Sequence, residues 1–253
     1  MMTYVGDSVE IIKKLHSTKQ WNEIISYCQS ILDSNPRDLI ALQNMGNALL
    51  NLGRYKEAIL ICDKVLQFND SDEYSIKNKI MALEKLGEYD SVILLCNTIL
   101  SKNPLNPWLL NSKGLAYNEL GQHDAAISFY DMTLKIDPKN ITALLNKANS
   151  LFFLENYVEA IQNYDLAQKI ENNNKISLAK SEAFLKLGKE DEAFLAAQGL
   201  LISEISSHVE GARIKKMKIF DYYCLVEYDS YKKRKTIKDD EIELRSEEHT
   251  SEL

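Results

Sequence analysis

Cysteines are the first residues in this sequence whose spacing suggests chemistry. Cys28, Cys62 and Cys96 stand 34 residues apart, and Tyr130 and Tyr164 continue the same spacing. A metal site or a disulfide would need these side chains close together, because disulfide partners have Cα atoms within about 7 Å. Neighbouring packed helices lie about 8–10 Å apart. We therefore interpret the three cysteines as core residues, since free cysteine packs as a small hydrophobic side chain.

Histidines and short motifs give no support for catalysis. The four histidines, His16, His123, His208 and His249, are scattered along the chain. The sequence has no phosphate-binding G-x-x-x-x-G-K-[ST], no G-x-G-x-x-G, no H-E-x-x-H and no G-x-S-x-G. We predict that the chain is not an enzyme and that it uses no cofactor and no metal.

Composition sets limits on the class of protein. The 253 residues are 45% hydrophobic and include only 4 prolines, which is typical of an ordered chain. A formal charge of -7 disfavours a nucleic-acid partner, which would require a positive surface. No apolar run reaches the roughly 18 residues that cross a bilayer, and charged residues interrupt the first segment where a signal peptide would be apolar. We expect no membrane partner and a cytoplasmic location.

A repeat sets the organisation of the chain. The dipeptide Leu-Gly recurs along the chain. Its glycine is Gly53, Gly87 and Gly121, which are 34 residues apart, and Gly188 further on. Each copy follows an apolar-periodic segment and precedes a second one. A glycine placed there ends a helix in the left-handed conformation at no steric cost. The pattern predicts pairs of antiparallel helices, with Gly46 and Ala58 as small residues that allow two helices of one pair to approach closely.

These segments resemble the tetratricopeptide repeat (TPR) family. The resemblance is carried by LQNMGNALLNLGRYKEAILICDKVL (42–66) and LNSKGLAYNELGQHDAAISFYDMTL (110–134). It implies an all-α fold, a right-handed α-α superhelix of about six helical hairpins plus a C-terminal capping helix. The expected array spans 1–207, with repeats at about 5–38, 39–72, 73–106, 107–140, 141–174 and 175–207. Glu155 departs from the pattern because it occupies the glycine position of the fifth repeat, although Asn156 beside it tolerates positive φ.

The family resemblance also implies a binding surface, because the first helix of each hairpin lines the concave groove. One offset holds Asn44, Asn78, Ser112 and Asn146 in successive repeats. Side-chain amides both donate and accept hydrogen bonds, so such a row can bind an extended peptide backbone. The alternative is that these amides are only solvated. The predicted groove residues are Gln43, Asn44, Asn47, Tyr74, Lys77, Asn78, Met81, Trp108, Asn111, Ser112, Leu145, Asn146 and Asn149.

The C-terminal part of the chain differs from the array. Residues 208–244 are expected to form a capping helix and tail, since a repeat array needs an end with one polar face. Residues 245–253, RSEEHTSEL, look like the translation of a widely used sequencing-library adapter and are excluded from fold reasoning. Without their net charge of -2, the formal charge of -7 becomes -5. Such an adapter would replace the natural C-terminus. The question whether a downstream domain is missing from this sequence therefore stays open.

The leading hypothesis from the sequence is a non-catalytic scaffold or adaptor that binds a peptide segment or partner protein in the concave groove. A first alternative is the regulatory or targeting region of a larger enzyme truncated at about residue 244. A second is a self-assembling structural array, since the exposed ends of solenoids can stack, so self-association is possible. Fold alone does not assign a biological process.

Overall fold

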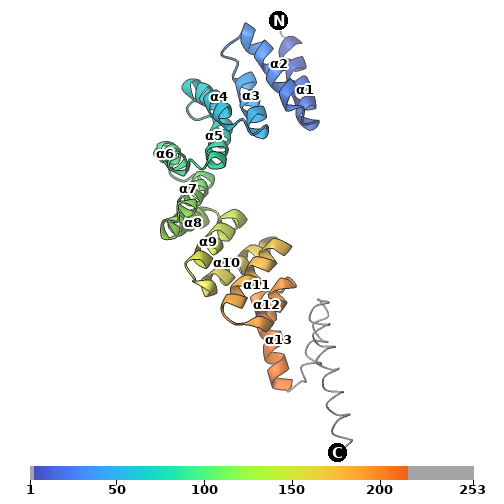
Figure 1. Ribbon diagram of the computed structural model, residues 1–253, viewed down its shortest axis with the longest axis vertical. Coiled ribbons are helices and arrows are strands. Elements are labelled where there is room, and N and C mark those ends of the chain that lie inside the picture. The colour runs from blue at the N-terminus through green and yellow to red at the C-terminus, as the bar shows by residue number, and fades with distance from the viewer. Residues whose placement is uncertain (1–2, 216–253) are drawn as a thin grey trace, which may run out of the picture. The chain divides into compact units, whose positions relative to one another are not determined.

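The computed structural model describes residues 3–215, and every regular element within that range is a helix (Figure 1). The all-α class predicted from the sequence is confirmed. The described part of the chain divides after Gly121 into two compact units. The first unit contains α1 (Thr3–Ser17), α2 (Trp21–Ser34), α3 (Leu39–Asn51), α4 (Tyr55–Phe68), α5 (Glu73–Leu86), α6 (Tyr89–Leu100) and α7 (Pro107–Glu119). The second contains α8 (His123–Ile136), α9 (Ile141–Phe153), α10 (Tyr157–Ile170), α11 (Asn174–Lys186), α12 (Glu190–Ala197) and α13 (Ile202–Lys215).

Several sequence predictions concern residues beyond Lys215. They are the greater part of the capping segment 208–244, the adapter-like residues 245–253, and the side chains of Cys224 and His249. All of these lie outside the described residues. The repeat boundaries proposed from the sequence stay predictions.

Side-chain caps begin alternate helices. In α3, α5, α7, α9 and α11, an aspartate or asparagine just before the helix accepts a hydrogen bond from a backbone N–H of the first turn. Such a cap satisfies one of the amide donors that a helix start leaves without a partner, which stabilises the helix by about 1 kcal/mol. The capping residues are Asp38, Asp72, Asn106, Asn140 and Asn173.

Left-handed residues separate the paired helices. Gly53 and Gly87 have φ values of 75° and 72°, as the Leu-Gly pattern predicted. In the turn between α9 and α10, Glu155 itself adopts φ 60°, while Asn156 has φ -81°. The left-handed conformation in this turn therefore falls on a residue with a Cβ, although the neighbouring asparagine is better suited to it.

The core of each unit lies between successive helices. In the first unit, a Cβ built on Gly46 would lie 3.4 Å from Cys62 Sγ and 3.5 Å from Ile61 Cγ2. The close approach of α3 and α4 predicted at Gly46 is thus present, and its contacts are Ile61 and Cys62. In the second unit, Tyr164 and Phe184 are buried in one cluster with residues from α9 to α13.

The last described hairpin has a short second helix. α12 ends at Ala197, whereas α4, α8 and α10 each span 14 residues. Gly199 follows with φ 84°, and α13 begins at Ile202. A non-helical connection, residues 198–201, therefore lies inside the range 175–207 that the sequence assigned to one repeat.

Candidate functional site

The three regularly spaced cysteines are core residues, as the sequence indicated. Cys28, Cys62 and Cys96 are free and at most 2% exposed. Burial raises the pKa of the Cys28 thiol to about 11, and the pKa values of Cys62 and Cys96 to about 12. A raised pKa keeps each thiol protonated and unreactive at neutral pH. Within residues 3–215, no group of three or more histidine, cysteine or acidic side chains is arranged to hold a metal ion.

On α3, two of the predicted groove residues are tied to neighbouring elements. Gln43 Nε2 donates to Asp72 Oδ2 at 2.6 Å. Asn44 Oδ1 lies 3.0 Å from His16 Nε2, and its amide nitrogen donates to the Ile40 carbonyl at 2.7 Å. These amides connect α3 to α1 and to the start of α5. They therefore have structural partners, and are not simply solvated.

On α5, the predicted residues differ widely in exposure. Asn78 is only 5% exposed, and its amide nitrogen makes no hydrogen bond within the described part of the chain. Tyr74 and Met81 are 42% and 45% exposed. Partial burial raises the pKa of the Tyr74 hydroxyl. The exposed face of α5 is thus formed by Tyr74, Lys77 and Met81, with Asn78 beneath it.

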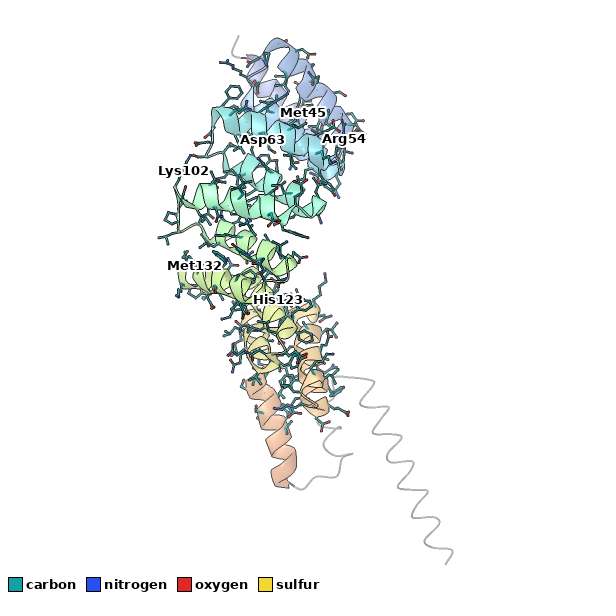
Figure 2. The ribbon with its side chains drawn as sticks, turned by 60° about the vertical axis from the view of Figure 1, so that its left-hand side comes forward. Met45, Arg54, Asp63, Lys102, His123 and Met132 are labelled. Atoms are coloured by element: carbon teal, nitrogen blue, oxygen red, sulfur yellow. The ribbon has the colours of Figure 1, made fainter. Side chains whose placement is uncertain are left out.

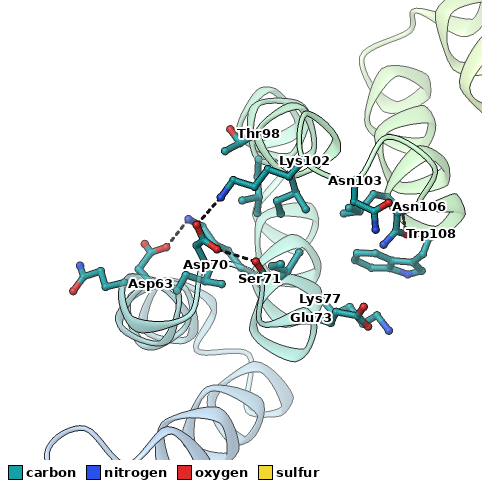
Figure 3. Close-up of a pocket in the computed structure, with 17 residues that line it drawn as sticks. Asp63, Asp70, Ser71, Glu73, Lys77, Thr98, Lys102, Asn103, Asn106 and Trp108 are labelled. Carbon is teal, nitrogen blue, oxygen red and sulfur yellow. Dashed lines mark hydrogen bonds and ion pairs between the residues drawn. The ribbon is translucent and has the colours of Figure 1, made fainter.

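Trp108 and Lys77 line a cavity of about 740 Å³ in the first unit (Figure 3). Helices α4, α5, α6 and α7 and the two connections 69–72 and 101–106 surround it. Its apolar lining residues are Leu66, Ile76, Leu95, Ile99, Trp108 and Leu109. Lys77 Nζ lies 5.6 Å from the centroid of the Trp108 ring, a cation–π contact. The structure therefore brings together two predicted groove residues that are 31 positions apart.

Two ion pairs stand at the edge of this cavity. Lys79 Nζ lies 2.5 Å from Asp63 Oδ1, and Lys102 Nζ lies 2.5 Å from Asp70 Oδ2. Figure 2 places Asp63 on α4 and Lys102 just beyond α6. None of these four residues was predicted from the sequence to belong to a site. A signal for one pair was present, because Asp131 and Lys147 repeat Asp63 and Lys79 after 68 residues, which is two repeats.

Of the remaining predicted residues, Asn47 is half-buried on α3, and the others lie on α7 and α9. On α7, Ser112 is 5% exposed and Asn111 is half-buried. On α9, which belongs to the second unit, Leu145 and Asn146 are half-buried. Asn149 is exposed and accepts a hydrogen bond from the Tyr164 hydroxyl at 2.6 Å. The predicted row thus includes two buried positions, Asn78 and Ser112, and two half-buried ones, Asn44 and Asn146.

No helix in the described range is both long enough and apolar enough to cross a membrane.

Comparisons with known proteins agree with the hairpin architecture. A family model described as the N-terminal TPR repeats region of Psidin matches residues 47–160. No curated protein matches the sequence. A tetratricopeptide repeat protein from Parabacteroides merdae ATCC 43184 has a similar structure, with a TM-score of 0.65, 17% identity, and coverage of 93% of this chain and 91% of that one. The 41-end form of MamA from Desulfovibrio magneticus RS-1 gives a TM-score of 0.58 and 21% identity over 65% of this chain and 93% of its own. At these identities the likeness shows the fold.

Proposed function

Because this chain belongs to the tetratricopeptide repeat family, we propose that it acts as a non-catalytic interaction scaffold that binds a polypeptide segment. The observation that carries this proposal is the cavity of about 740 Å³ beside Trp108 and Lys77. Its volume is within the range of about 300–1,000 Å³ typical of ligand pockets. Its lining combines an aromatic side chain and aliphatic walls with charged residues at the edge.

The chemistry of the lining favours a peptide with a bulky apolar side chain. Aromatic residues in a desolvated pocket with a polar rim are typical of interface positions that contribute most binding energy. The Trp108 ring and the Ile76 and Ile99 side chains supply the apolar contact. The lysine and aspartate side chains at the rim supply hydrogen bonds to a main chain that lies across the opening. We place this scaffold in the cytoplasm, with a protein as its partner.

The test is an affinity measurement with a partner recovered by affinity purification. Trp108→Ala removes the aromatic wall, and we expect it to weaken binding by at least roughly tenfold, as truncation of an aromatic anchor usually does. Lys77→Ala removes only the cation–π contact and should weaken binding by roughly twofold to fivefold. Calorimetry on purified components provides both values.

Leu60→Ala is the matched control, because Leu60 lies on α4, is 63% exposed and does not line the cavity. The Leu60→Ala variant should bind the partner with the same affinity as the unsubstituted chain. Helical circular dichroism must be the same in all three variants. Full affinity of the folded Trp108→Ala variant would show that the partner binds elsewhere.

A further inference from the structure

An aspartate–lysine pair recurs between successive hairpins. In each case the aspartate stands eight residues after the first residue of a second helix, and the lysine six residues after the start of the next helix. The pairs are Asp63–Lys79 at 2.5 Å, Asp131–Lys147 at 2.6 Å and Asp165–Lys180 at 2.9 Å. Each pair lies within one unit. The repeat therefore builds the same ion pair three times.

The third pair differs from the other two in its burial. The lysine and aspartate side chains are 21% and 40% exposed in Asp63–Lys79, and 19% and 45% exposed in Asp131–Lys147. In Asp165–Lys180 the values are 0% and 4%. The difference arises because α12 ends early, and the connection to α13 lies on the pair.

The contacts to this connection are made by its main chain. Lys180 Nζ donates to the Leu200 carbonyl at 2.7 Å, and Asp165 Oδ1 accepts from the Ile202 backbone N–H at 2.7 Å. The ion pair itself stays intact at 2.9 Å. The pair therefore binds a carbonyl and an N–H two residues further along.

Side chains on either side of this main chain are apolar. Leu200 is 7% exposed and belongs to the core of the second unit, and Ile202 packs against that core. Leu201 between them is half-buried. The bound sequence is thus an apolar-x-apolar segment. A buried ion pair needs such additional hydrogen bonds, since they satisfy the charged atoms that water would otherwise solvate.

From this internal example we propose that Asp63 and Lys79 bind the main chain of an apolar-x-apolar partner segment in the same way. Lys79 Nζ donates to a carbonyl of the segment, and the Asp63 carboxylate accepts from the N–H two residues later. The proposal rests on the proposed function, since it names the main-chain subsite of that scaffold.

The first pair has both the capacity and the setting for this role. An ammonium group carries three donors and a carboxylate about four acceptor positions, so the mutual hydrogen bond leaves several of each available. Both residues line the cavity in the first unit, and Figure 3 shows Asp63 there. The aliphatic wall of the cavity, including Leu66, Ile76 and Leu95, offers an apolar surface to such a segment, as the core of the second unit does to Leu200 and Ile202.

The protein supplies its own probe for the test. A fluorescently labelled synthetic peptide of residues 195–205, LAAQGLLISEI, would be titrated against the full chain and followed by fluorescence anisotropy. We expect saturable binding. Lys79→Met should weaken it by roughly tenfold, the usual size for loss of a hydrogen bond to a charged group. The matched control is Lys64→Met, which removes an exposed lysine of α4 that does not line the cavity, and it should leave the affinity within roughly twofold.

A modified peptide tests the main-chain contact directly. Methylation of the amide nitrogen of Ile202 removes the donor that the aspartate accepts, and should weaken binding by roughly tenfold. Methylation one residue later, at Ser203, is the control and should have little effect. Absence of binding, or equal affinity of the two methylated peptides, would overturn the inference.

The outcomes also separate this inference from the proposed function. Suppose that Trp108→Ala weakens binding of the peptide and that Lys79→Met does not. The cavity then binds the peptide, but the Asp63–Lys79 ion pair forms no hydrogen bonds with its main chain. In that case the inference fails and the scaffold function stands. If neither variant affects peptide binding, the peptide binds elsewhere and the inference fails, while the proposed function is judged by its own partner.

Discussion

At the scale of single residues, the repeat buries three cysteine thiols that would be reactive if they were exposed to solvent. Cys28, Cys62 and Cys96 fill the same place in α2, α4 and α6 that Tyr130 and Tyr164 fill in α8 and α10. A thiol and a phenol differ greatly in size, so neighbouring side chains must adjust to each. Burial of the thiols accounts for the raised pKa values, because the low dielectric of the core disfavours the thiolate.

These thiols should not react while the protein is folded. At pH 8.5, iodoacetamide is expected to modify Cys28, Cys62 and Cys96 only in denaturant, as measured by mass spectrometry of the peptides that contain them. The sign of the pH effect follows from the raised pKa values. The stability that thiol burial contributes is fully present below the ordinary thiol pKa of 9.0 and is lost as pH rises toward about 12. Rapid labelling of Cys62 or Cys96 in the native protein would contradict this account.

At the scale of elements, the helices follow from the sequence because their signals are local. Asp72 before α5 and Gly87 after it are a cap and a left-handed stop, and both can be read from the residue types alone. The early end of α12 was not predicted, although Gly199, with φ 84°, is a left-handed stop of the same kind. The binding of the following connection by Asp165 and Lys180 has no local signal, because these two residues come from two other helices. The cavity was missed because side chains of four helices form it, although Lys77 and Trp108 were predicted as groove residues.

The turn after α9 provides a test at this scale. Glu155 holds φ 60°, a conformation that costs a residue with a Cβ about 1–2 kcal/mol. Glycine adopts it without strain but loses more entropy on folding, so Glu155→Gly should stabilise the protein by about 0.5–1 kcal/mol. Urea denaturation measures the change. Gly87→Ala is the opposite substitution at φ 72° and should destabilise by about 1 kcal/mol. A loss of stability in Glu155→Gly would contradict the assignment of strain to this turn.

At the scale of the whole molecule, the structure consists of two compact units, each with its own core. Hairpins in such arrays are stabilised mainly by their neighbours, so exposed positions can vary without loss of the fold. This freedom leaves residues such as Trp108 and Lys77 available for binding. The hairpins could be recognised from the repeat, whereas the cavity in the first unit became apparent only in the structure.

The most direct test of the central claim is site-specific photo-crosslinking. p-Benzoylphenylalanine would replace Lys77 at the cavity, and in a separate variant Leu60, which is exposed on α4 away from it. After irradiation with the partner, mass spectrometry would locate the crosslinked residues. The account predicts a crosslink from position 77 to one short segment of the partner, with little or none from position 60. Equal crosslinking from both positions, or none from position 77 while the partner remains bound, would contradict it.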